Sequence, residues 1–286
     1  MRPLGLKGHH MRNIDSETVA GFGDEWSRLD QRGLPSPERQ AQFEAYFSLF
    51  PWAMVGSQAV GFDAGCGSGR WVALVAPRIG MLHCIDASAR ALDVARRNLA
   101  ELSNVRFSQA SVQDLPFDDA SMDFGYSLGV LHHVPDTAAA MAACVRKLKP
   151  GAPFLVYLYY AFDNRPPWFR AIWRLGDGAR QIVSRLPYAA RYGASQVIAA
   201  ALYWPLARTA WVLERLGVRA PNLPLHAYRN RSFYSMRTDA LDKFGTRLEQ
   251  RFSRQQIEAM MMSAGLERIT FRDDVPFWCA IGYRVA

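Results

Sequence analysis

Val60-Gly-Phe-Asp-Ala-Gly-Cys-Gly-Ser-Gly-Arg70 carries the strongest structural signal in this sequence. A short apolar segment runs into three glycines at alternate positions. Because glycine has no Cβ, such a loop can turn sharply and bring its backbone close to a ligand. The stretch therefore predicts a ligand-binding turn at the carboxyl end of a β-strand.

A second acidic residue helps to identify the ligand. Asp86 ends the apolar segment Met81–Ile85, about one βαβ repeat after the glycine loop. That spacing suits an acid that holds the hydroxyls of a ribose. The pyrophosphate of a dinucleotide needs the spacing G-x-G-x-x-G, but the third position here is Arg70. The loop therefore favours a nucleoside ligand without a pyrophosphate.

The form Asp63-x-Gly65-x-Gly67-x-Gly69 resembles motif I of class I S-adenosylmethionine (SAM) methyltransferases, in particular a methyltransferase-11 (UbiE-like) core. Four later segments resemble further motifs of that family in the same order. They are residues 110–117, 118–124, 125–135 and 148–154. The resemblance covers residues 58–160 and leaves both ends of the chain unmatched.

The resemblance implies an α/β fold: a doubly wound, seven-stranded, mostly parallel Rossmann-like sheet that binds SAM and releases S-adenosylhomocysteine. The cofactor-binding residues that it implies are Asp63, Gly65, Cys66, Gly67, Gly69, Asp86, Ala87, Ser111, Val112, Asp114 and Leu128. One departure concerns the adenine. The family usually has Asp at the position of Ser111. In this chain either the Ser111 hydroxyl or the Asp114 carboxylate would accept a hydrogen bond from the adenine amino group. The backbone N–H of Val112 is available in either case.

The domain organisation is predicted from helical and strand periodicity. Residues 1–57 are expected to form an N-terminal helical lid, with a helix at Pro37–Phe50. Residues 58–160 form the SAM-binding core, residues 161–251 a large helical insertion or cap after strand five, and residues 252–286 the end of the core. Ser88 and Ser253 are predicted helix caps, the latter within a capping box. The last strands are expected at Leu266–Phe271 and Phe277–Val285.

Composition limits the partners and the compartment. The 286 residues are 50% apolar, and the net charge is +8. Residues 161–251 hold 15 Lys and Arg against 6 Asp and Glu, whereas the rest of the chain holds 19 against 20. Such clustering suggests an anionic partner, which is either a phosphorylated or carboxylated substrate or a lipid surface.

The cysteines and the hydrophobic segments indicate a cytoplasmic protein. The four cysteines have no C-x-x-C spacing and are expected to be reduced thiols. Residues 1–10 lack the apolar region of a signal peptide. Tyr192–Ala207 is too short to span a membrane and contains Pro205. We predict no metal site, because His9, His10 and His226 have no partners at ligand spacing.

Candidate catalytic residues lie where strands four and five end. His132 and His133 follow strand four, and histidine can act as a general base near neutral pH. His133 is preferred, and packing against the cofactor is the competing interpretation. Tyr157 and Tyr159 alternate onto one face of strand five. The predicted substrate-binding residues are Trp26, Tyr46, Tyr159, Tyr228, Arg229, Arg231 and Tyr234, of which the Arg- and Tyr-rich set at 228–237 would form an anion-binding wall.

The leading hypothesis is a SAM-dependent methyltransferase for a small or amphipathic, anionic acceptor, with lid and cap closing over the site. The acceptor atom (oxygen, nitrogen or carbon) and the oligomeric state stay open. A nucleic-acid methyltransferase is a weaker alternative, because Ser127–Val130 replaces the Asn/Asp-Pro-Pro-Tyr segment of base-modifying enzymes. A third possibility is a non-catalytic SAM-binding or membrane-surface protein, whose residues 192–216, with Tyr203, Trp204 and Trp211, would contact an anionic bilayer.

Overall fold

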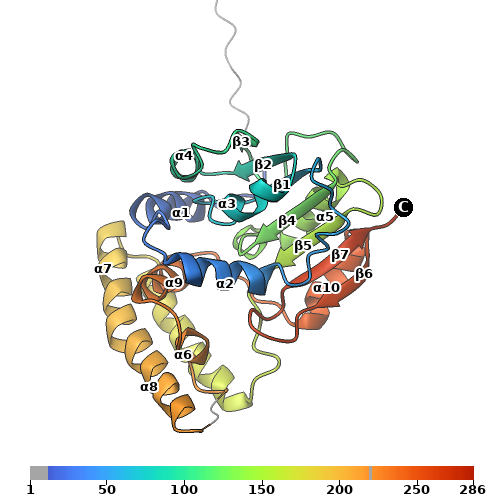
Figure 1. The fold of residues 1–286 in the computed structure, drawn as a ribbon. Helices are drawn as coiled ribbons and strands as arrows, with labels where there is room; N and C mark the ends of the chain where they lie inside the picture. The colour runs from blue at the N-terminus through green and yellow to red at the C-terminus, as the bar shows by residue number, and fades with distance from the viewer. Residues whose placement is uncertain (1–11, 219–220) are drawn as a thin grey trace, which may run out of the picture.

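The computed structural model describes residues 12–218 and 221–286 and is shown as a ribbon in Figure 1. The prediction about a signal peptide, together with His9 and His10, lies outside the described residues. Among the described residues, no helix is long and apolar enough to cross a membrane.

A seven-stranded sheet forms the centre of the molecule. Its strands are β1 (Val60–Ala64), β2 (Met81–Asp86), β3 (Val105–Gln109), β4 (Phe124–Leu128), β5 (Pro153–Tyr157), β6 (Leu266–Phe271) and β7 (Ala280–Arg284). Their order is β3-β2-β1-β4-β5-β7-β6, and β7 runs antiparallel to both neighbours. The mostly parallel sheet that the sequence predicts is therefore confirmed. The strand order reverses between β1 and β4, which places the expected ligand crevice at their carboxyl ends.

Apolar residues cover both faces of the sheet. On one face, Phe62 and Phe154 pack with α5 (Thr137–Lys147) and α10 (Arg254–Ser263). The other face carries α3 (Val72–Val75), η1 (Ala76–Arg78) and α4 (Ala89–Asn98). Both predicted caps are confirmed: Ser88 accepts from the Ala91 N–H, and Ser253 forms a reciprocal capping box with Gln256.

The N-terminal segment adds α1 (Ser16–Arg28) and α2 (Ser36–Tyr46). The helix predicted at Pro37–Phe50 ends four residues early, at Tyr46, and residues 47–49 form turns before Pro51. Its aromatic side chains pack beneath the sheet. α1 packs against α4, and a Cβ on Gly23 would lie 2.6 Å from Ser88 Oγ. The glycines that obscure this helix in the sequence therefore permit its close packing.

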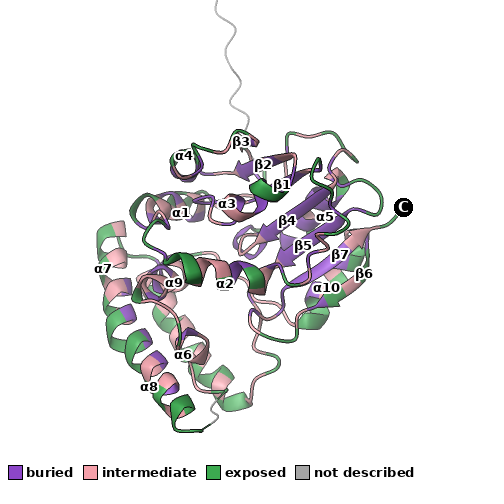
Figure 2. Cartoon of the chain, viewed as in Figure 1, coloured by how far each residue is buried: buried purple, intermediate pink, exposed green. Residues whose placement is uncertain are grey.

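The insertion after β5 is helical, as predicted. It contains α6 (Pro167–Val183), α7 (Tyr188–Ile198), η3 (Ala199–Tyr203), α8 (Trp204–Arg215), η4 (His226–Tyr228) and α9 (Phe233–Gly245). In Figure 1, α7 and α8 continue one another as a rod at the outside of the molecule. Figure 2 shows that α6, α7 and α8 are largely exposed, whereas the strands are buried. We call residues 161–251 the cap.

Candidate active site

A cavity of about 130 Å³ lies at the glycine loop, where β1, β2 and β4 end. Its wall includes the predicted cofactor residues Gly65, Cys66, Gly67, Asp86, Ala87, Ser111, Val112 and Leu128. His133 and two aromatic residues of α1, Phe22 and Trp26, also line it. The sheet topology thus brings together residues from the carboxyl ends of four strands, β1, β2, β3 and β4, that are far apart in the sequence.

Asp86 is held rigidly beside the glycine loop. Its Oδ2 accepts from the Gly67 N–H at 2.9 Å, and its Oδ1 accepts from the Ser88 N–H at 2.8 Å. Burial raises the pKa of the Asp86 carboxyl, although both backbone donors favour the charged form. Asp86 therefore presents a fixed acceptor to a ligand in this cavity.

The glycines of the loop adopt conformations that other residues rarely take. Gly65, Gly67 and Gly69 have φ angles of 90°, 52° and 79°. A Cβ on Gly67 would lie 2.9 Å from Nε1 of Trp26, and a Cβ on Gly65 would lie 2.4 Å from a Val130 methyl group. Helix α1 therefore lies directly over the loop, with Trp26 as its closest side chain.

Asp63 lies behind the cavity wall with an unpaired oxygen. Its side chain is buried, and Oδ2 has no hydrogen-bond partner among the described residues. Burial raises the pKa of Asp63 to about 8. Gly69 also lies off the cavity wall. Its positive φ angle contributes to the turn of the loop. An unpaired buried carboxyl at this loop is compatible with a ligand that carries a polar, cationic end.

Ser111 and Asp114, the two alternatives for the adenine contact, are neighbours, and the Ser111 hydroxyl donates to Asp114 Oδ2 at 3.3 Å. Ser111 is buried on the cavity wall, whereas Asp114 is off it. The Arg12 guanidinium binds the Asp114 carboxylate, with Nε 2.9 Å from Oδ1, and lowers the pKa of that carboxyl. Because Asp114 is already paired, Ser111 and the Val112 backbone are better placed for a ligand.

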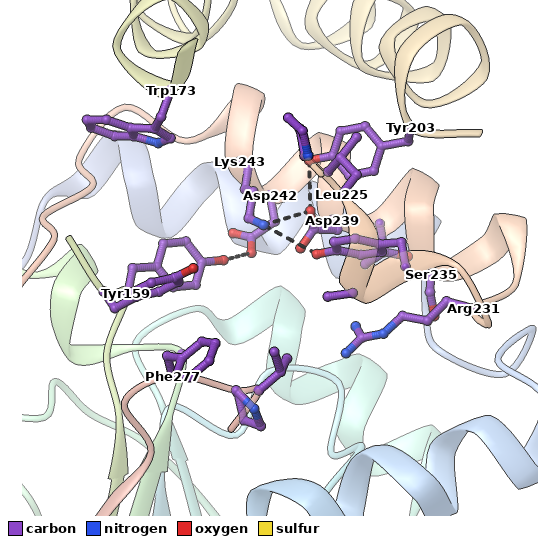
Figure 3. A pocket seen from close by; sticks show the side chains of 18 of the residues that line it. Tyr159, Trp173, Tyr203, Leu225, Arg231, Ser235, Asp239, Asp242, Lys243 and Phe277 are labelled. Carbon is purple, nitrogen blue, oxygen red and sulfur yellow. Dashed lines mark hydrogen bonds and ion pairs between the residues drawn. The ribbon is translucent and has the colours of Figure 1, made fainter. Parts of the chain in front are cut away.

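A second cavity, of about 640 Å³, lies between the sheet and the cap. The two cavities are adjacent, because both are lined by Phe22, Trp26, Arg70, Trp71, Leu128 and Gly129. Of the residues predicted from the sequence, the wall of the large cavity includes Trp26, Tyr46, Tyr157, Tyr159, Tyr228 and Arg231. Figure 3 shows this cavity with Tyr159 on one side and Arg231 pointing into it from the other.

Three of the predicted catalytic and substrate-binding residues lie on neither wall. Arg229 pairs with Glu214 at 2.6 Å, and the Tyr234 hydroxyl accepts from the Gln31 N–H at 2.9 Å. His132 is completely buried, and its Nδ1 accepts from the Tyr159 N–H at 3.4 Å. These contacts engage the three side chains away from the space that a ligand would occupy.

The sequence analysis missed an acidic cluster in the large cavity. Asp239 and Asp242 line it from α9, together with Lys243, and Glu25 lines it from α1. Lys243 lies 3.0 Å from Asp239, whose pKa stays below the ordinary value although burial acts to raise it. Asp239, Asp242 and Lys243 recur at helical spacing, which was the available signal. This spacing alone did not show that the three side chains line a cavity, because that depends on where the cap packs.

Asp242 differs from Asp239 because it lacks a cation within ion-pair distance among the described residues. The Tyr159 hydroxyl donates to its Oδ2, as Figure 3 shows. Its Oδ1 has no hydrogen-bond partner in the described parts of the chain. Burial raises the pKa of Asp242 to about 7. A carboxyl with this pKa exchanges protons near neutral pH.

His133 lies between Asp242 and the smaller cavity. Its Nδ1 is 2.7 Å from the Leu248 carbonyl oxygen, so Nδ1 carries the proton of the neutral ring. Its Nε2 is then an acceptor, 3.8 Å from Asp242 Oδ1. Burial lowers the pKa of His133 to about 4. When this pair holds a proton near neutral pH, the proton therefore resides on the carboxyl group and not on Nε2.

Three guanidinium groups on the wall of the large cavity have no carboxylate partner among the described residues, and one of them, Arg165, donates to the Pro221 carbonyl and the Asn222 side chain. Arg70 stacks on Trp71 at 4.1 Å, and Arg231 stacks on Tyr228 at 4.9 Å. Neither has an ion pair within the described residues. The other cavity cations include three that are paired, namely Arg180 with Asp177, Lys243 with Asp239 and Arg251 with Glu249. Arg70 and Arg231 therefore give this cavity a place for an anionic group.

Comparison with known proteins gives a domain family. Residues 62–156 match a family described as "Methyltransferase domain". The chain is 36% identical over 107 residues to a ubiquinone biosynthesis O-methyltransferase of Alkalilimnicola ehrlichii, covering 37% of this chain and 42% of that protein. It is 31% identical over 124 residues to a demethylmenaquinone methyltransferase of Staphylococcus epidermidis, covering 42% and 49%. The chain therefore spans less than half of either relative.

Solved structures show the same fold at low sequence identity. A SAM-dependent methyltransferase of Aquifex aeolicus is 13% identical, with a TM-score of 0.50 over 91% of this chain and 96% of that one. The protein BH2331 of Bacillus halodurans is 14% identical, with a TM-score of 0.51 over 80% and 71%.

The sheet order, the glycine loop and the fixed acid after β2 define a class I SAM-dependent methyltransferase fold. Residues 62–156 match the methyltransferase-domain family, and the cofactor that this match supports is SAM. The class and the cofactor predicted from the sequence are both confirmed.

Proposed function

We propose that this protein transfers a methyl group from SAM to a small amphipathic acceptor that carries an anionic group. The adjacency of the two cavities carries the proposal, because one lies at the glycine loop and the other is large enough for an acceptor. Ligand cavities typically occupy about 300–1,000 Å³. The larger cavity is within that range, and the smaller one is below it.

The cofactor would be held by the glycine loop, by Asp86 at the ribose and by Ser111 and Val112 at the adenine. When bound, SAM supplies an electrophilic methyl group on a sulfonium. The Asp86 carboxylate, fixed by two backbone N–H groups on the cavity wall, fits the ribose of such a ligand. Because the smaller cavity is below the usual range, we infer that Trp26 and the rest of α1 move outward when the cofactor binds.

The acceptor would bind against the aromatic wall of the large cavity. Tyr46, Tyr157 and Tyr159 offer apolar ring faces, and Arg70 and Arg231 would bind its carboxylate or phosphate. The lipid-surface partner suggested by the sequence is compatible with an amphipathic acceptor of this kind. The names of the two quinone-pathway relatives indicate small-molecule acceptors. This supports a small acceptor for the present protein without identifying it.

Asp242 is the best-placed group to take a proton from the acceptor. It lines the large cavity beside His133, which lines the smaller one. A pKa of about 7 gives a working base near neutral pH. His133 would position it, since Nε2 can accept from the protonated carboxyl. Burial raises the pKa of Tyr157 well above its ordinary value, which suits a wall residue better than a base.

A calorimetric titration tests the cofactor, with S-adenosylhomocysteine in one experiment and NAD in another. We expect binding of S-adenosylhomocysteine alone. Methyl transfer is then measured by mass spectrometry with 3,4-dihydroxybenzoate, which combines a ring, hydroxyls and a carboxylate, and with catechol, which lacks the carboxylate. Preference for the carboxylate-bearing probe supports the anionic acceptor. Binding of NAD alone, or no methylated product with either probe, contradicts the proposal.

A further inference from the structure

Helix α6 carries an apolar stripe that faces solvent. The stripe consists of Trp168, Ile172, Leu175, Ala179, Ile182 and, just beyond the helix, Leu186. These residues recur every three or four positions, so they lie on one side of the helix. Leu175 is 78% exposed and Ile182 is 68% exposed, and α6 contains no buried residue. A helix that packed only within the protein would turn such a stripe toward its core.

The exposed apolar surface is concentrated in the cap. Of the fifteen large apolar residues that are strongly exposed among those the structure describes, twelve lie between residues 161 and 251. They include Val197, Trp204 and Val212 on the rod of α7 and α8. Figure 2 shows the exposed surface of α6, α7 and α8. Contiguous exposed apolar surface usually marks an interaction site.

Basic side chains flank the stripe. Arg170, Arg174 and Arg185 are exposed, and the cap has a net charge of +9. Apolar residues with tryptophan on one face and arginine beside them are typical of helices that lie in the interface of a bilayer. Anionic lipid headgroups would neutralise this charge, whereas a second copy of the chain would bring two positive caps together. Charge therefore favours a lipid surface over self-association.

The opposite side of α6 faces the large cavity. Phe169, Trp173, Asp177 and Arg180 line the cavity, and Ile172 belongs to both the cavity wall and the exposed stripe. One helix therefore separates the cavity from the apolar surface. An acceptor with an apolar tail could enter along α6 from a membrane without crossing water.

We propose that the α6 stripe docks onto an anionic lipid bilayer and places the mouth of the acceptor cavity at the membrane surface. The contact surface differs from the one the sequence suggested at residues 192–216: Tyr203 is buried there and donates to Asp239 at 2.8 Å. The docking stands on the exposed stripe and its charge. The entry route for the acceptor rests on the proposed function.

Vesicle co-sedimentation tests the docking with the full chain. The vesicles contain phosphatidylcholine alone or phosphatidylcholine with phosphatidylglycerol. We expect binding to the anionic vesicles only, weakened by added salt because headgroup attraction is screened. The double substitution L175N/I182N should weaken binding by about tenfold or more, since it removes apolar area from the interface. R170Q/R174Q should weaken binding to anionic vesicles and reduce its salt dependence.

Met262→Asn is the matched control, because Met262 is 58% exposed on α10, outside the cap. It should bind vesicles as the wild type does. Each variant should keep its melting temperature and its affinity for S-adenosylhomocysteine, which shows that folding and the cofactor site are intact. Vesicle binding that is unchanged in L175N/I182N, no binding to anionic vesicles, or a dimer in sedimentation equilibrium that dissociates in L175N/I182N would each overturn the proposal. None of these outcomes depends on methyl transfer.

Discussion

Two carboxyl groups at this site, Asp86 and Asp242, differ in their hydrogen-bond partners. Asp86 accepts from two backbone N–H groups, which fix its direction. Asp242 accepts from one hydroxyl and keeps an unpaired oxygen beside His133. The first arrangement suits binding and the second suits proton transfer.

Asp86→Ala should weaken binding of S-adenosylhomocysteine by about tenfold to a hundredfold, because it removes a charged acceptor from the cavity wall. Calorimetric titration measures the affinity. Asp93→Asn is a suitable control, since Asp93 is an exposed residue of α4 that pairs with Arg96. Equal affinity of Asp86→Ala and wild type for S-adenosylhomocysteine would show that Asp86 does not bind the ribose.

Asp242→Asn should lower kcat by about a hundredfold, because the amide cannot accept a proton. In the wild type the base must be ionised, so kcat should rise as the pH passes through about 7 and then level off. The variant should lose this rise. Asp239→Asn removes a neighbouring carboxylate whose pKa is low, and its profile should keep the rise. A rise retained in Asp242→Asn would assign the base elsewhere.

The same substitution gives a readout that needs no acceptor. The pKa of Asp242 is higher in the folded chain than in the unfolded one, so the folded state binds the proton more tightly. Stability from this group is therefore present at low pH and lost as the pH rises through about 7. The melting temperature of Asp242→Asn relative to wild type should therefore increase as the pH rises from about 5 to about 8. A constant difference across this range would contradict the elevated pKa.

At the scale of elements, α1 covers the glycine loop although it lies outside the matched domain. Trp26 approaches Gly67, Phe22 contacts His133 with ring centroids 4.9 Å apart, and Glu25 reaches the large cavity. One helix therefore touches both cavities. Its first turn is capped by Asp15, which accepts from the Thr18 N–H at 2.8 Å.

Movement of α1 should be visible in amide hydrogen exchange. S-adenosylhomocysteine should change exchange within residues 16–28, since the helix must make room for the ligand and then cover it. Trp26→Ala should reduce that change, because it removes the side chain over Gly67. α10 serves as the internal control, since it touches neither cavity. Identical exchange of α1 with and without ligand would contradict a lid.

At the scale of the whole molecule, the acceptor cavity exists because the cap packs against the core. Arg70 follows the glycine loop, whereas Arg231 comes from the cap, 161 positions later by residue number. Packing also connects Arg180 of α6 to the carbonyl oxygens of Thr246 and Arg247. The proposed anion site therefore depends on the packing of the cap against the core.

Arg231→Gln should weaken binding of 3,4-dihydroxybenzoate by about tenfold, because one charge-assisted contact is lost. Affinity for catechol, which has no carboxylate, should stay as in the wild type. Calorimetry with the S-adenosylhomocysteine complex measures both. Arg106→Gln changes an exposed arginine of β3 and should alter neither. Parallel losses for the two probes would indicate a packing role for Arg231.

Local sequence patterns accounted for much of this protein. The glycine loop, Asp86 and the serine caps depend on neighbours along the chain, because turns and helix ends are set by a few adjacent residues. Alternation of strands and helices was likewise sufficient to predict a doubly wound, mostly parallel sheet. Helix α1 escaped because Gly21 and Gly23 lower helix propensity, and only its packing on α4 makes them favourable.

The chemistry of the acceptor site required the three-dimensional structure. Asp242, His133 and Glu25 meet from three separate elements, and burial alters their pKa values through low polarity, which a linear pattern does not encode. Arg229 and Arg231 look equivalent in the sequence, yet Arg229 pairs with Glu214 and Arg231 faces the cavity. The cofactor class could therefore be predicted from the sequence, because it depends on short-range geometry. The groups that face the proposed acceptor could not, because long-range packing determines them.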